Sequence, residues 1–97
     1  MCGIFGAVTT SGLDTSLVQS ISTLLEHRGP DGHGHEQFRC APERTIDLLH
    51  RRLVIIDLSH DANQPMRNAE ASHWTVYNGE IYNYIELREE LRHAGHI

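Results

Sequence analysis

The chain has 97 residues, enough for one small domain and too few for two. Its 39% hydrophobic and 22% charged residues exclude a disordered chain, and its longest aliphatic run, residues 53–56, is far too short to span a membrane. The net charge of −5 argues against nucleic acid or an anionic membrane as a partner, and the missing secretory signal and sparse cysteines favour a cytoplasmic protein.

The first predicted element is a buried strand over residues 3–10, preceded directly by Cys2. If Met1 is removed, Cys2 carries a thiol and a free α-amine, which together can act as nucleophile and base. Gly3 and Gly6 are unusual in a strand and indicate the close approach of another backbone or a ligand. A disulfide between Cys2 and Cys40 is the alternative for the thiol.

A helix follows the turn at residues 11–12, with Asp14 as the expected N-cap. Its apolar residues fall on one stripe, which predicts a face packed in the core: Leu17, Val18, Ile21, Leu24 and Leu25. Gly29 and Pro30 then end the helix.

Residues 27–32 are predicted to form a tight loop, either as simple turn chemistry or with Arg28 and Asp31 as a local ion pair. The His33, His35 and Glu36 cluster that follows is interpreted as part of a polar, glycine-rich loop. No metal site is predicted, because no second cluster at ligand spacing accompanies it.

Three further strands and one helix are expected in the second half of the chain. Residues 45–50, 52–57 and 74–77 have strand character, residues 57–67 form a surface connection, and Asn78–Gly79 is a turn. The last helix has Asn83 as its cap, Glu86 in capping-box position and Gly95 at its end. Its apolar stripe is made by Tyr84, Leu87, Leu91 and Ala94.

A terminal cysteine that attacks an amide needs oxyanion donors and charged groups that hold the substrate. Asn78 and Gly79 could supply the donors, Arg52 could bind a carboxylate bidentately, and Glu80 could bind an amine. The substrate with these three groups would be glutamine. Each residue also has a plain alternative: Asn78–Gly79 as a hairpin turn, Arg52 as a strand-end residue, and Glu80 as an acidic residue near a helix start.

Five segments together resemble the class II glutamine amidotransferase domain found in glutamine-dependent asparagine synthetases. The Cys-Gly-Ile start is shared across class II amidotransferases, whereas the loop at 27–31 and the segment at 78–83 favour the asparagine synthetase branch. The similar segments are residues 1–6, 27–31, 50–57, 64–66 and 78–83.

The resemblance implies an α+β fold, the four-layer αββα sandwich of the N-terminal nucleophile hydrolases. It also implies that Cys2 attacks the side-chain amide of L-glutamine, forms a glutamyl thioester and releases ammonia, with its own α-amine as base. By the matching segments, Asn78 and Gly79 form the oxyanion hole, Arg52 binds the α-carboxylate and Glu80 helps to hold the α-amine. The backbone near Val54 and Ile55 lines the pocket.

In the family, ammonia passes to a C-terminal synthetase domain that activates aspartate with ATP and Mg²⁺, in a parent that can be a homodimer. The family's glutaminase domain continues well beyond 97 residues. We therefore expect this chain to be its N-terminal part, without a cofactor of its own, an incomplete sandwich with apolar sheet faces exposed. Two alternatives stay open: a glutaminase that serves another acceptor, and an inactive truncated fragment.

Overall fold

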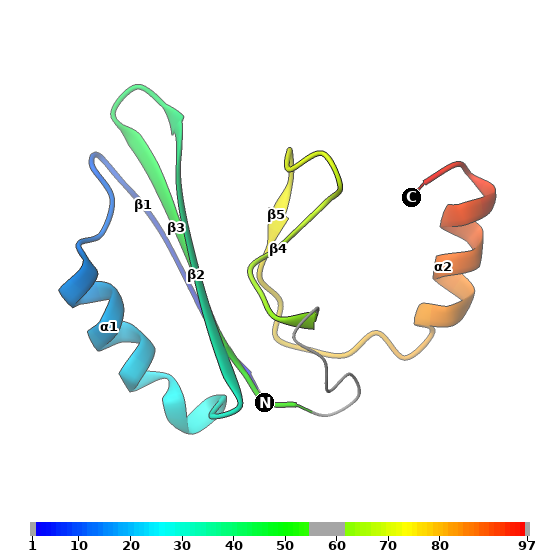
Figure 1. Ribbon diagram of the computed structural model, residues 1–97, viewed down its shortest axis with the longest axis horizontal. Coiled ribbons are helices and arrows are strands. Elements are labelled where there is room, and N and C mark those ends of the chain that lie inside the picture. Colours follow the sequence, from blue (N-terminus) through cyan, green and yellow to red (C-terminus); the bar gives the residue numbers. More distant parts are fainter. Residues whose placement is uncertain (1, 55–61, 97) are drawn as a thin grey trace.

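The computed structural model describes residues 2–54 and 62–96, which form two antiparallel sheets and two α-helices (Figure 1). The larger sheet contains β1 (Gly3–Thr9), β2 (Gly32–Ala41) and β3 (Arg44–Arg52) in the order β1-β3-β2. Helix α1 (Thr15–Leu24) lies along one side of this sheet, and the β4–β5 hairpin lies on the other (Figure 1). The mixed α and β content agrees with the expected fold class.

Strand β3 is the centre of the larger sheet, and its register sets the two faces. Gly3 pairs with Arg51 on one side, and Gly32 pairs with Arg52 on the other. Two sequence predictions were wrong here. The His33–Glu36 segment belongs to a ten-residue strand instead of a loop, and residues 44–52 form one strand where two were expected to meet near residue 51. The rest of the predicted 52–57 strand falls mostly outside the described residues, and 53–54 are not in a strand.

Helix α1 begins where the sequence predicted, because the Asp14 carboxylate accepts a hydrogen bond of 2.8 Å from the Leu17 N–H. A short 3₁₀ helix, η1 (Glu26–Arg28), continues the chain. The packed apolar stripe was only partly correct. Val18, Ile21 and Leu25 are half-buried, but Leu24 is 72% exposed and no residue of α1 is fully buried.

Leu49 is the one fully buried hydrophobic residue among those described, and its buried neighbours on β3 are polar. Asp47 is 0% exposed and accepts hydrogen bonds from His35, Gln37 and the Leu13 N–H. These bonds connect β2 and the β1–α1 loop to the central strand. Part of the opposite sheet face is exposed, with Val8 65% exposed.

The second half of the chain packs loosely. A hairpin of β4 (Met66–Arg67) and β5 (Trp74–Thr75) contacts the larger sheet where Trp74 stacks on Phe38, with ring centroids 6.1 Å apart. The predicted 74–77 strand is therefore shorter, and the predicted 57–67 connection contains β4. Asn78–Gly79 does not join two strands.

Helix α2 (Tyr84–His93) starts after Asn83 as predicted, although the Asn83 side chain makes no capping hydrogen bond. It lies apart from the sheet and has no buried residue, so its apolar stripe faces solvent (Figure 1). None of the helices described is long and apolar enough to cross a bilayer.

Candidate active site

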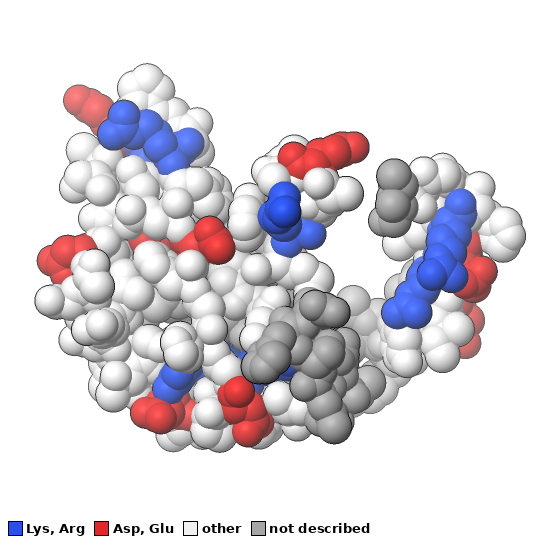
Figure 2. Space-filling view, viewed as in Figure 1, with Lys and Arg blue, Asp and Glu red and all other residues white. Residues whose placement is uncertain are grey.

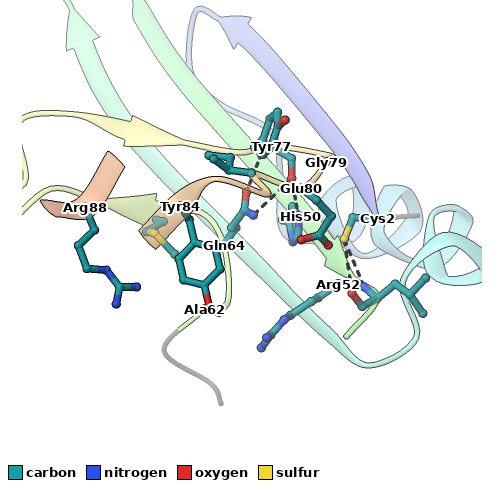
Figure 3. A pocket seen from close by; sticks show the side chains of 13 residues that line it. Cys2, His50, Arg52, Ala62, Gln64, Tyr77, Gly79, Glu80, Tyr84 and Arg88 are labelled. Atoms are coloured by element: carbon teal, nitrogen blue, oxygen red, sulfur yellow. Dashed lines mark hydrogen bonds between the residues drawn. The ribbon is translucent and has the colours of Figure 1, made fainter. Parts of the chain in front are cut away.

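Cys2 lies at the entrance of β1, held against the backbone that follows β3. Its Sγ is 3.3 Å from the Leu53 N–H nitrogen and 3.8 Å from the Leu53 carbonyl oxygen (Figure 3). The Arg28 Nε donates a hydrogen bond of 3.4 Å to the Cys2 carbonyl. Both Cys2 and Cys40 are free thiols, so the alternative of a disulfide is wrong. The Leu53 backbone thus positions the thiol, and the Arg28 side chain holds the Cys2 backbone.

Of the predicted 27–32 loop, residues 29–31 lie between η1 and β2, and they hold this arrangement in place. Gly29 is buried against the Arg51–Arg52 peptide, and a Cβ at this position would overlap that backbone. Asp31 accepts a hydrogen bond of 2.8 Å from the Val54 N–H, and its own N–H donates to the Arg52 carbonyl at 3.0 Å. The ion pair between Arg28 and Asp31 is not among the ion pairs of the described residues. The loop is built to fix the end of β3 instead.

A cavity of about 650 Å³ opens beside the Cys2 thiol. Of the residues with a predicted role, Cys2, Arg52, Gly79 and Glu80 line it. Its far wall is formed by α2, including Tyr84 and Arg88 (Figure 3). The space-filling view shows the molecule hollowed between the β4–β5 hairpin and α2, where arginine side chains follow the helix (Figure 2). The cavity therefore brings a thiol, a guanidinium and a carboxylate together.

Arg52 is buried at the wall of this cavity, 7% exposed, with its Nη1 2.9 Å from the Asn63 Oδ1. A side chain held in this way keeps its guanidinium in one orientation, which favours bidentate binding of a carboxylate. The Asn63 contact links Arg52 to the connection that precedes β4.

The other predicted residues lie differently. Asn78 does not line the cavity, and its side-chain oxygen is buried without a hydrogen-bond partner. Val54 does not line it either, and its N–H is bound to Asp31. Ile55 lies outside the described residues.

His50 is a cavity residue to which the sequence assigned no role. It is 1% exposed, and its Nε2 is 3.3 Å from the Tyr77 carbonyl oxygen. Burial lowers the pKa of His50; the Tyr77 carbonyl opposes this, and the positive charge of Arg52 adds to it, so the pKa lies below its usual value of 6.5. The ring is therefore neutral at pH 7.

His50 and Arg52 are two residues apart on β3, so both side chains lie on the Cys2 face of the sheet. This spacing from Arg52 was the available signal for His50. For Gln64, which also lines the cavity, local sequence offered only a turn signal, because its role depends on contacts across the fold.

No three His, Cys, Asp or Glu side chains gather as a metal site in the described parts of the chain. His35, from the cluster considered in the sequence, contacts Asp47 instead.

Comparison with protein families matches residues 1–97 to a glutamine amidotransferase domain. The chain belongs to the glutamine amidotransferase domain family. Among its relatives, a glutamine-hydrolysing asparagine synthetase of Bacillus subtilis is 36% identical over 99% of this chain, and one of Saccharomyces cerevisiae is 35% identical over 93%. The amidase chyE of Penicillium rubens is 44% identical over 70% of the chain and 9% of its own length.

This amidotransferase chain spans about 15% of the length of the two asparagine synthetases. No solved structure matches it.

Proposed function

We propose that this amidotransferase chain carries the glutamine-hydrolysing site of a longer protein, with Cys2 as the nucleophile. The observation that carries the proposal is the shared cavity, where the Cys2 thiol lies with Arg52, Gly79 and Glu80. Arg52 binds the glutamine α-carboxylate and Glu80 binds the α-amine. These contacts place the side-chain amide near the thiol.

The reaction then runs in two steps. The Cys2 sulfur bonds to the amide carbon while its α-amine, exposed by loss of Met1, takes the thiol proton. Asn78 and the Gly79 N–H stabilise the oxyanion, the C–N bond breaks, and the proton goes to the leaving ammonia. Water hydrolyses the thioester to glutamate and restores the thiol.

We further propose that the larger sheet is one half of an αββα sandwich and that the chain is the N-terminal part of its domain. The exposed part of the sheet face and the short share of the relatives' length support this. In the longer protein, the ammonia is used by a synthetase domain that forms asparagine from aspartate with ATP and Mg²⁺. The names of the two asparagine synthetases support this acceptor.

A second candidate is the same glutaminase serving another acceptor, and the match to an amidase favours keeping it. An assay with glutamine and a panel of carboxylic acids distinguishes the two. Amidation of aspartate supports the first candidate, and amidation of another acid alone supports the second.

The decisive test is Cys2→Ala in the full-length protein. We expect glutamine-dependent synthesis to be lost and ammonia-dependent synthesis to continue, because only the nucleophile is removed. A glutamine analogue with an electrophilic carbon at the amide position should label Cys2. Intact mass should show that Met1 is absent, and an active enzyme that retains Met1 would contradict the proposal.

A further inference from the structure

The backbone of Tyr77 is held by two side chains from distant parts of the fold. The Gln64 Oε1 accepts a hydrogen bond of 2.5 Å from the Tyr77 N–H, and the Gln64 Nε2 donates one of 3.3 Å to the Tyr77 carbonyl. The side-chain amide of Gln64 thus contacts Tyr77 as a neighbouring strand would. The His50 Nε2 lies 3.3 Å from the same carbonyl (Figure 3).

Among the described residues, these contacts are what holds the segment that carries Asn78 and Gly79. Strand β5 ends at Thr75, and residues 76–80 are not in a strand. Within the described parts of the chain, every hydrogen bond found for the backbone of residues 76–80 is made by Tyr77. The position of Gly79 in the cavity wall therefore depends on how Tyr77 is held.

His50 is a rigid anchor. It is buried on the central strand, and because a carbonyl oxygen only accepts, its Nε2 must carry the proton. Its Nδ1 is then bare, which suits a buried atom without a partner better than an N–H would.

Gln64 is fixed by packing. Its main-chain carbonyl lies directly over Gly34 of β2, where a Cβ would overlap it. The glycine between two histidines therefore lets the 62–65 connection lie against the sheet. Both anchors are placed by the larger sheet, which also places Cys2.

We propose that Gln64 and His50 are positioning residues that set the oxyanion donors relative to Cys2. The inference rests on the proposed glutaminase function. Because the oxyanion forms only in the reaction, displaced donors lower kcat and leave the KM for glutamine nearly unchanged. Removing one such donor typically costs about 10²–10³ in rate. For a displaced donor we expect a loss of about 10- to 100-fold.

The test compares kcat and KM for glutamine hydrolysis in the full-length protein. Gln64→Met keeps the length of the side chain and removes both hydrogen bonds, and His50→Phe keeps a ring and removes one. We expect both to lower kcat while Cys2 is still alkylated by iodoacetamide at the wild-type rate. His50→Gln retains a donor that can reach the Tyr77 carbonyl and should recover part of the loss.

Asn68→Ala is the matched control. The Asn68 amide also binds backbone, accepting from the Ser72 and His73 N–H groups, but at the far end of the β4–β5 hairpin. It should keep kcat within about twofold. If Gln64→Met does not fold, His50→Phe tests the same carbonyl from the other side.

Wild-type kcat in Gln64→Met and His50→Phe would overturn the inference while leaving the glutaminase function intact. A rise in KM alone, or a slower alkylation of Cys2, would overturn it as well, because the residues would then act on substrate binding or on the thiol. A wild-type protein that cannot hydrolyse glutamine would overturn the proposed function itself.

Discussion

Asp47 is the residue whose chemistry most depends on its surroundings. Burial raises the pKa of its carboxyl group, but hydrogen bonds from His35, the Leu13 N–H and Gln37, together with the charge of His35, outweigh this, and the pKa lies below its usual value of 3.8. Asp47 is therefore ionised at neutral pH and joins three segments of the chain. Its contribution to stability is present above pH 3.8 and is lost as the pH falls through the lower pKa of the folded state.

Replacing Asp47 with Asn should destabilise the chain by about 2–3 kcal/mol at pH 7, because a buried acceptor of three hydrogen bonds becomes partly a donor. Urea unfolding measures the loss. Asp14→Asn is the control, since Asn caps a helix as well as Asp and should change little. The gap between wild type and Asp47→Asn should narrow below pH 3.8. A constant gap down to pH 2 would contradict the role given to the charge.

At the scale of elements, the sequence predicted those whose signals are local. Asp14 and its hydrogen bond to Leu17 define the start of α1, and the start of α2 after Asn83 was also correct. Strand β2 was missed because glycine and histidine have little strand propensity, and pairing with β3 supplies what they lack. Residues 45–50 and residue 52 were expected in separate strands. They form one strand because β3 pairs along its length with β1 and β2.

The residues of the candidate site also divide into those with a local sequence signal and those without one. Arg52 and Glu80 could be predicted as substrate-binding residues, because their charges suit the carboxylate and the amine of glutamine. Both line the cavity together with Cys2. The contacts of Gln64 could not be predicted, because they join residues 13 positions apart on either side of the short β4–β5 hairpin, which has little local signal in the sequence.

Gly34 offers a test of how the elements fit together. Gly34→Ala should lower the free energy of unfolding by about 1–3 kcal/mol, because the new Cβ would overlap the Gln64 carbonyl and displace its loop. Gly32→Ala is the matched control on the same strand. Its Cβ would lie 3.2 Å from the Asn63 Oδ1, a contact that a displacement of a few tenths of an ångström relieves.

The fluorescence of Trp74, the one tryptophan of the chain, reports both transitions in urea. Equal midpoints for Gly34→Ala and Gly32→Ala would show that the 62–65 connection does not lie against the sheet.

At the scale of the whole molecule, stability is concentrated in the larger sheet. Leu49 is buried between β1 and β2, whereas α2 has no buried residue and Leu91 is 52% exposed. A ten-residue helix with no buried residue is marginal in water. Residues that join the sheet should thus control unfolding, and those of α2 should not.

The same substitution at two leucines tests this division. Leu49→Ala should cost about 2–4 kcal/mol, because it leaves a cavity in the only fully buried apolar site of the described residues. Leu91→Ala should change the stability of the sheet by less than about 0.5 kcal/mol. Trp74 fluorescence follows the sheet through its stacking on Phe38, and far-UV circular dichroism follows the helices. Equal losses for the two variants would mean that α2 unfolds together with the sheet, and that its exposed stripe is packed in solution.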